Sequence, residues 1–154
     1  MPDQNEQSLS LTAREIVKAY WAALFSRDPA KIRAAVTQDV EWLAPPANAT
    51  AVALGVTHHM VGPDAIIKFI LEDFRRLFSN GMEIDVISST AEGNRVVIEQ
   101  RQRATLAGGQ DFDLVYVFIF ETADGKVSRI REYMDTFGGH AIVFGAGETP
   151  RQIV

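Results

Sequence analysis

Residues 131–135, Arg-Glu-Tyr-Met-Asp, bring two carboxylates to the end of an alternating strand pattern. Ile130 and Met134 lie two residues before and after Glu132, and residues two apart share one face of a strand. Glu132 therefore interrupts an apolar face, whereas Asp135 falls on the opposite face unless a bulge intervenes. A carboxylate among apolar side chains gains a higher pKa and becomes suited to general acid–base chemistry. Glu132 and Asp135 are the candidate catalytic residues.

Glu132 has an ordinary alternative role and a chemical one. In the first, it forms an ion pair with Arg103, Arg129 or Arg131 at the edge of a strand. In the second, it lies in a pocket, where burial without a partner favours uptake of a proton. The interruption of an apolar face favours the pocket. Which of Glu132 and Asp135 faces that pocket is left open by the sequence.

Two glutamines interrupt a second apolar strand face. Gln100 and Gln102 share this face with Val96 and Ile98, and buried amides need hydrogen-bond partners. A proton transfer next to a carbonyl creates an enolate oxygen that hydrogen-bond donors stabilise. The candidate substrate-binding residues are the following aromatic, histidine and amide side chains: Tyr20, Trp42, His58, His59, Phe69, Gln100, Gln102 and Tyr116.

No metal or cofactor site is expected. His58 and His59 are adjacent, so on an extended segment at most one of them faces a pocket, and no third metal ligand follows at a recognisable spacing. The sequence has no cysteine, which excludes thiolate nucleophiles and Cys-ligated zinc. It also lacks a nucleophile elbow, a phosphate loop and a dinucleotide fingerprint. We therefore expect cofactor-free chemistry.

The composition is typical of one globular domain. The chain has 154 residues, of which 47% are hydrophobic and 23% charged, and this indicates a single domain over residues 1–154. The net charge of −5 disfavours nucleic acid as a partner. The first ten residues lack the pattern of a signal peptide, and no apolar run reaches the length of a membrane span. We expect a cytoplasmic protein without membrane contact.

Helical periodicity dominates the first half of the chain. Three helices are predicted: over residues 12–26, from residue 28 onward, and over residues 62–80. The first begins with a capping box at Thr12 and Glu15, after a disordered segment over residues 1–10. Residues 45–61, which follow a short strand at 40–43, carry no formal charge and no clear periodicity. This pattern indicates an irregular loop that acts as a partial lid.

Strand periodicity dominates the second half. Four strands are predicted, over residues 82–90, 95–106, 111–121 and 127–135. The turns between them are short, which favours an antiparallel meander with the helices on one face, an α+β arrangement. The strand 111–121 is apolar on both faces, so we expect the face without helices to meet a second subunit in a homodimer. Residues 136–154 are expected to form a C-terminal tail that packs over the sheet or a neighbour.

The order of these elements, and the segment Asp-Gly-Lys-Val-Ser-Arg-Ile-Arg-Glu-Tyr-Met-Asp at residues 124–135, resemble SnoaL-like domains of the ketosteroid isomerase type. These domains belong to the nuclear-transport-factor-like (cystatin-like) superfamily, and the resemblance covers residues 12–137. It implies a cone-shaped α+β barrel, in which three N-terminal helices pack on a curled, mostly antiparallel sheet. Phenazine biosynthesis A/B proteins are similar over the same last strand: their acid/base glutamate falls on Glu132, and their pocket histidine falls near Phe69.

Limonene-type epoxide hydrolases also resemble this end of the chain. Their water-activating aspartate falls on Asp135, whereas their arginine and second aspartate fall on Gln100 and Gln102. The absence of both charges disfavours epoxide hydrolysis, which is kept as a third alternative.

Polyketide cyclases of the SnoaL type and ketosteroid isomerases use a cavity carboxylate to move a proton next to a carbonyl. The resemblance therefore implies a cofactor-independent isomerase or cyclase that binds a hydrophobic carbonyl compound, with Glu132 as acid/base. The alternative is a non-catalytic module of the same fold, which binds a small ligand or mediates dimerisation. The pKa of the pocket acid separates the two, because a base tuned towards neutrality favours catalysis.

Overall fold

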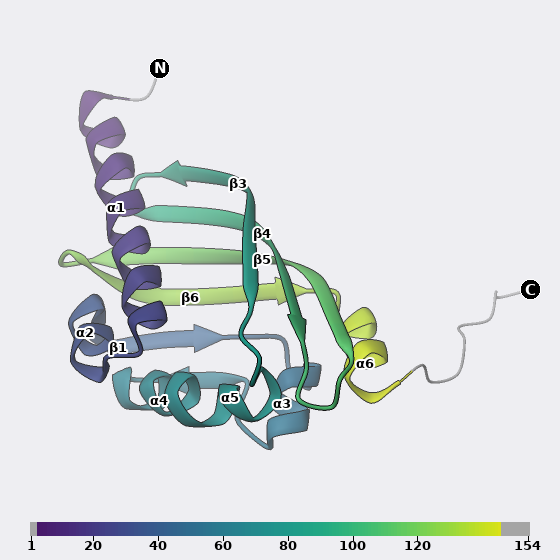
Figure 1. Cartoon of the computed structure of the whole chain (residues 1–154). Coiled ribbons are helices and arrows are strands. Elements are labelled where there is room, and N and C mark those ends of the chain that lie inside the picture. The colour runs from purple at the N-terminus through teal and green to yellow at the C-terminus, as the bar shows by residue number, and fades with distance from the viewer. Residues whose placement is uncertain (1–2, 146–154) are drawn as a thin grey trace, which may run out of the picture.

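The fold is a curled six-stranded sheet with α1 lying across one face, seen in the computed structural model, which describes residues 3–145 (Figure 1). The elements in chain order are α1 (Gln4–Ser26), α2 (Pro29–Ala35), β1 (Val36–Leu43), α3 (Ala49–Leu54), β2 (His59–Val61), α4 (Pro63–Lys68), a π-helical turn (Phe69–Asp73), α5 (Phe74–Leu77), β3 (Glu83–Glu92), β4 (Arg95–Thr105), β5 (Asp111–Ala123), β6 (Lys126–Met134) and α6 (Thr136–Phe144).

The sheet has the strand order β2-β1-β6-β5-β4-β3. Strands β3 to β6 form the predicted antiparallel meander, and each bound lies within two residues of the expected one. The last turn contains Asp124 and Gly125, both with positive φ as a tight hairpin turn requires. β1 begins at Val36, earlier than expected, and pairs in parallel with β6. The sheet is therefore mixed but mostly antiparallel, and the predicted α+β class is confirmed.

The first helix begins at Gln4, so the expectation of a disordered segment is wrong for residues 4–10. Thr12 does not cap the helix, because its hydroxyl donates to the Ser8 carbonyl one turn back, at 3.0 Å. Tertiary contacts hold the added turns: the Ser10 hydroxyl accepts from the Gly93 amide in the β3–β4 turn at 3.0 Å. Residues 1–2 lie outside the described part.

Residues 45–61 are not an irregular loop, because they contain α3 and β2. The Asn48 side chain accepts from the Ala51 amide at 3.0 Å and donates to the Pro45 carbonyl at 2.9 Å, which caps α3 at its start. Gly55 ends the helix with φ of 66°. A helix of six residues is too short to show periodicity, which explains the wrong expectation.

Asn48→Ala is expected to lower the free energy of unfolding by about 1–2 kcal/mol, because Asn48 is buried and its loss leaves the start of α3 uncapped. Urea denaturation of the wild type, Asn48→Ala and Asn48→Ser measures this effect. Serine restores a cap acceptor, so the Ser variant should recover part of the loss; equal stability of the Ala variant and the wild type would contradict the capping role.

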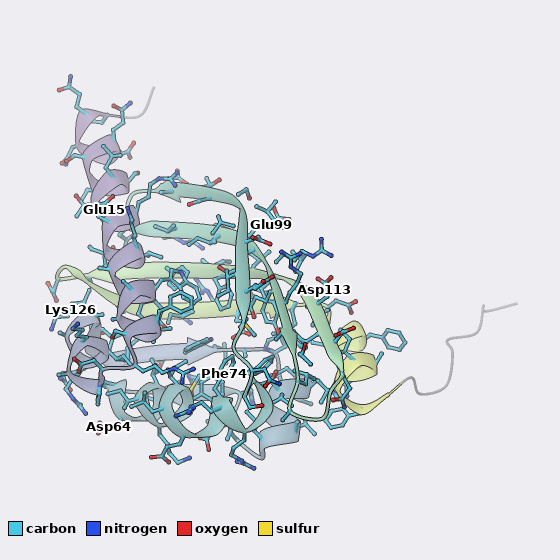
Figure 2. All side chains as sticks on the ribbon, in the orientation of Figure 1. Glu15, Asp64, Phe74, Glu99, Asp113 and Lys126 are labelled. Atoms are coloured by element: carbon cyan, nitrogen blue, oxygen red, sulfur yellow. The ribbon has the colours of Figure 1, made fainter. Side chains whose placement is uncertain are left out.

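The third predicted helix is interrupted. A π-helical turn over Phe69–Asp73 separates α4 from α5, and Lys68 Nζ lies 2.7 Å from Asp73 Oδ2 across that turn. Figure 2 shows Phe74, at the start of α5, on the inner side of the helix, whereas Asp64 at the start of α4 lies at the surface. Phe74 packs against the core that the sheet and helices share.

The expected tail begins with a helix. Asp135 caps α6 by accepting from the Gly138 amide at 2.9 Å. Gly139 is buried beside Leu114 and Ala49, so this turn of α6 packs against β5 and α3. The rest of the expected tail, residues 146–154, lies outside the described part of the chain.

The sheet face away from α1 carries exposed apolar side chains, with Val115 43% and Tyr133 51% exposed. The homodimer expected through this face stays a prediction. Sedimentation at micromolar concentration should give twice the mass of one chain, and Val115→Glu should shift the protein towards the monomer, because a buried charge is costly at an apolar interface. A monomeric wild type would contradict the prediction.

Candidate active site

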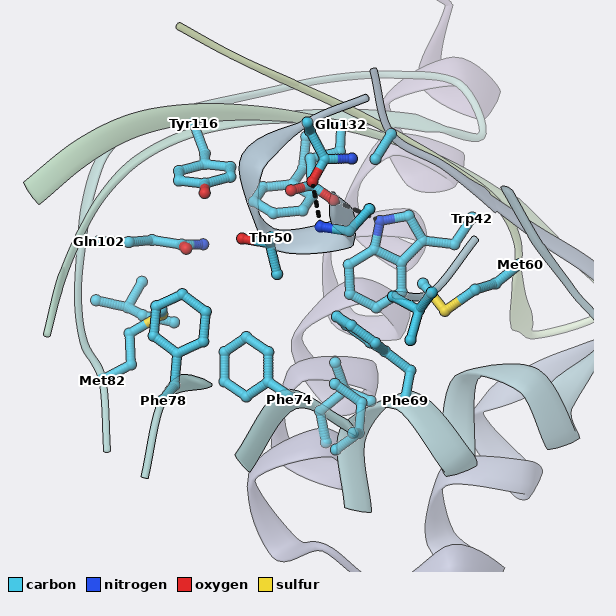
Figure 3. Close-up of a pocket in the computed structure, with 18 of the residues that line it drawn as sticks. Trp42, Thr50, Met60, Phe69, Phe74, Phe78, Met82, Gln102, Tyr116 and Glu132 are labelled. Carbon is cyan, nitrogen blue, oxygen red and sulfur yellow. Dashed lines mark hydrogen bonds between the residues drawn. The ribbon is translucent and has the colours of Figure 1, made fainter. Parts of the chain in front are cut away.

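A cavity of about 330 Å³ lies between the sheet, the helices α1, α3 and α5, and the π-helical turn. Its volume is in the range of sites that hold drug-sized molecules. Figure 3 shows that the polar groups Glu132, Tyr116, Thr50 and Gln102 gather on one side of it, and Phe74 and Phe78 lie across from them. In the described residues, 3–145, no group of three metal-ligating side chains is present, and no helix is long and apolar enough to cross a membrane.

Glu132 lies on β6, opposite Phe118 of β5, and its carboxylate faces the cavity. Trp42 of β1 donates from Nε1 to Glu132 Oε2 at 2.8 Å. Because β1 pairs in parallel with β6, Trp42 sits opposite Ile130, one inward position away from Glu132. The parallel pairing thus brings the indole N–H to the carboxylate.

Glu132 has no ion-pair partner among residues 3–145. Arg131 instead pairs with Glu121 at 2.7 Å, and Arg103 pairs with Asp85. The arginine alternative from the sequence is therefore not what the structure shows. Glu132 as a residue is partly buried because it lines the cavity, and its carboxylate is closely surrounded by protein.

Burial raises the pKa of Glu132 from 4.5 to about 7, and the Trp42 hydrogen bond opposes this rise with a smaller effect. At neutral pH the residue is therefore divided between the carboxylate and the carboxylic acid. Such a group can accept a proton from a ligand and return it at another position.

Three uncommitted polar groups lie near Glu132 in the cavity: the Tyr116 and Thr50 hydroxyls and the Gln102 amide. Burial, and secondly the charge of Glu132, raise the pKa of Tyr116, so its hydroxyl stays protonated and can donate. None of the three side chains forms a hydrogen bond within residues 3–145, so they are available to a ligand. Thr50 was not predicted, and its position in the uncharged segment 45–61 was the only signal.

The wall of the cavity opposite these polar groups consists of aromatic side chains. Phe69 makes an edge contact with Trp42 at a centroid distance of 5.9 Å, and Phe74 stacks on Phe78 at 4.4 Å. Phe69 and Ile70 belong to the π-helical turn and line the cavity, as expected for Phe69. π-helical turns often occur at functional sites, and here the turn directs apolar side chains towards Glu132.

The histidines separate as expected. His58 lines the cavity, whereas His59 is exposed on β2, with Nε2 3.7 Å from Glu41 Oε2. Tyr20 is fully buried and does not line the cavity, and its hydroxyl has no hydrogen-bond partner among residues 3–145. Burial, and secondly the charge of Glu132, raise the pKa of Tyr20.

Besides Tyr20 and His59, two further predicted site residues lie outside this cavity, so the prediction that all ten residues form one site is wrong for these four. Asp135 is exposed and caps α6, so Glu132 is the one of the two carboxylates that faces the cavity. Gln100 is buried but lines a different cavity. Gln102, two residues further along β4, is the glutamine that faces Glu132's cavity.

Trp42→Phe is expected to raise the pKa of Glu132 above its value of about 7, by about one unit, because the indole N–H stabilises the charged carboxylate. Carbon NMR titration of the side-chain carboxyl measures the midpoint, and the spectrum of Glu132→Gln identifies the resonance. Phe69→Leu is a matched control that touches the same indole without affecting its hydrogen bond. An unchanged midpoint in Trp42→Phe would contradict the assigned role.

Comparison with known proteins places the chain among small α+β domains. Residues 17–130 match the model of the SnoaL-like domain. No protein of curated function matches the sequence. Three solved structures are similar, and each comparison gives the sequence identity, the shares of this chain and of the other chain that are covered, and the TM-score. The first is an NTF2-like protein of unknown function from Burkholderia pseudomallei (identity 21%, coverage 86% of this chain and 98% of the other, TM-score 0.72). The second is TerC co-crystallised with polyporic acid (identity 25%, coverage 86% and 98%, TM-score 0.71). The third is a putative SnoaL-like polyketide cyclase from Jannaschia (identity 18%, coverage 96% and 99%, TM-score 0.70). These similarities confirm the predicted fold.

Proposed function

We propose that this chain, which belongs to the SnoaL-like domain family, is a cofactor-independent isomerase or cyclase acting on an apolar carbonyl compound. One observation carries the proposal: Glu132 is a carboxylate without a cationic partner, in an apolar cavity, beside hydrogen-bond groups that the protein leaves uncommitted. Structural side chains of this kind are normally paired, whereas catalytic acids are held in such surroundings.

The reaction begins with proton transfer to Glu132. Its carboxylate removes a proton from the carbon next to the carbonyl, and the C–H electrons form an enolate. Tyr116 and Gln102 donate hydrogen bonds to the enolate oxygen, on the side of the cavity where Figure 3 places them. The acid form of Glu132 then returns the proton to another carbon, which gives an isomer. Alternatively, the enolate carbon attacks a second carbonyl of the same molecule and closes a ring; the C=O π electrons move to that oxygen, and the acid form of Glu132 protonates the resulting alkoxide.

The ligand class follows from the walls. Aromatic side chains of α5 and the π-helical turn line the helix side, so the bound molecule is mainly apolar and has its carbonyl towards the sheet. Family membership supports an isomerase or cyclase, and the crystallisation of TerC with polyporic acid supports a small organic ligand. Epoxide hydrolysis has less support, because Asp135 lies outside the cavity.

The test combines binding with hydrogen exchange. Thermal-shift screening against steroid ketones, polyketide-like aromatic ketones and phenazine precursors identifies ligands. A ligand at a hundredfold excess over its Kd raises the free energy of unfolding by about 2.7 kcal/mol. Each ligand is then incubated with the protein in D₂O, and proton NMR follows loss of the hydrogens next to its carbonyl. We expect exchange above the buffer rate. Binding without exchange would favour the non-catalytic ligand-binding module. If no ketone binds, both the proposed enzyme and the ligand-binding module are contradicted.

A further inference from the structure

A second cavity, of about 430 Å³, lies between α1 and the strands β3 and β4. Figure 1 shows the arrowhead end of β3 reaching α1. Trp21, Phe25 and Ile84 line both cavities, so they form the partition between them. The second cavity contains neither Glu132 nor any other member of the polar group around it.

A strand irregularity accounts for this space. The register of β3 against β4 shifts between Val86 and Ser88, and such a bulge bends the strand. Beyond the bulge, Arg14 Nη1 donates to Ser89 Oγ at 2.8 Å and ties β3 to α1. Before the bulge, Val86 is 61% exposed and leaves the gap uncovered.

Gln100 supplies a buried polar group in this cavity. It lies opposite Val86, is 1% exposed, and its Nε2 has no hydrogen-bond partner among residues 3–145. Buried amide groups are almost always paired, so an orphaned N–H₂ in a cavity wall indicates a missing acceptor. A ligand oxygen would supply that acceptor.

The mouth of the cavity is cationic. Arg14 and Lys18 lie on successive turns of α1 and both line the cavity. Glu15 lies three residues before Lys18 on α1 but does not line the cavity, and neither Arg14 nor Lys18 forms an ion pair within residues 3–145. Two cations without an ion pair at one cavity mouth favour an anion at this position, in a chain of net charge −5.

We propose that this cavity is a second ligand site, which binds an apolar organic acid. The carboxylate lies between Arg14 and Lys18, the apolar body packs on Trp21 and Ile98, and an oxygen of the body accepts a hydrogen bond from Gln100. The site is separate from the chemistry at Glu132, so it stands whether or not the proposed reaction is correct.

The test uses 4-benzoylbenzoate, an apolar keto acid that inserts into nearby C–H bonds under near-ultraviolet light and adds its full mass. Peptide mass spectrometry of the irradiated protein should find adducts at Val17, Val86 or Ser89, which line only the second cavity. Benzophenone has no carboxylate and should label these positions at least tenfold less. Absence of adducts at all three, or equal labelling by the two compounds, would overturn the proposal.

Matched variants separate this site from general charge effects. Lys18→Glu should lower the labelling at least tenfold, and Gln100→Leu should lower it severalfold while circular dichroism shows an intact fold. Lys31→Glu makes the same charge change on α2, and Arg27→Glu makes it beside the cavity of Glu132, so both should change the labelling less than twofold. A loss in either control as large as in Lys18→Glu would overturn the site.

Discussion

Glu132→Gln is expected to lower the rate of hydrogen exchange and of turnover by about 10²–10⁴-fold, the usual contribution of a positioned general base. Glutamine keeps the shape of the side chain and an acceptor for the Trp42 N–H, so the fold and ligand binding should persist. In the wild type the rate should rise with pH up to about 7 and then level, because the charged form of Glu132 is the base. Steady-state rates and NMR exchange measure both effects.

Asp135→Asn is the matched control for this prediction. Asparagine is as good a helix cap as aspartate, and Asp135 lies outside the cavity, so the rate should stay within about twofold of the wild type. A Glu132→Gln enzyme with full activity would remove Glu132 from the mechanism. A large loss of activity in Asp135→Asn would instead support Asp135 as a catalytic residue.

Glu132→Gln should also stabilise the protein at alkaline pH. The pKa of Glu132 is raised on folding, so the native state holds more protons than the unfolded chain between pH 4.5 and about 7, and stability falls as pH rises through that range. Ionisation of Glu132 in the folded protein lowers the free energy of unfolding by about 3 kcal/mol, at 1.36 kcal/mol per pKa unit. This full cost is present at pH 8 and absent well below pH 4.5. Glu132→Gln should therefore gain about 3 kcal/mol over the wild type at pH 8, but only about 1 kcal/mol at pH 5.

Urea denaturation at both pH values measures these differences. Glu121→Gln is the control, since Glu121 pairs with Arg131 on the outer face and its removal should not stabilise the protein at either pH. A difference between wild type and Glu132→Gln that is the same at pH 5 and pH 8 would show that burial does not perturb the ionisation of Glu132.

The strand half of the site could be predicted from the sequence, because alternation assigns faces directly. Glu132, Gln102 and Tyr116 lie inward as their patterns indicate. Alternation cannot say what covers a face, however. Gln100 and Gln102 point to the same side of β4, yet α1 and the bend of β3 give Gln100 a cavity of its own.

The helical half was harder to predict. α3 is too short to show a period, so Thr50 could not be placed in the cavity. The apolar stripe over residues 62–80 fits a regular α-helix, and nothing in it marks the turn at Phe69–Asp73. The extra residues of α1 depend on contacts with a hairpin some eighty positions later, such as that between Ser10 and Gly93, which local patterns do not contain.

The π-helical turn also bears on how the binding cavity can diverge. A π-helical turn accommodates one additional residue, so the side chains after it are rotated relative to those before it. α4 uses Ile66 for the common core, whereas Phe69, Ile70 and Phe74 shape the cavity. Evolution can therefore exchange side chains at these three positions, and change which molecules fit, while the anchoring of α4 stays the same.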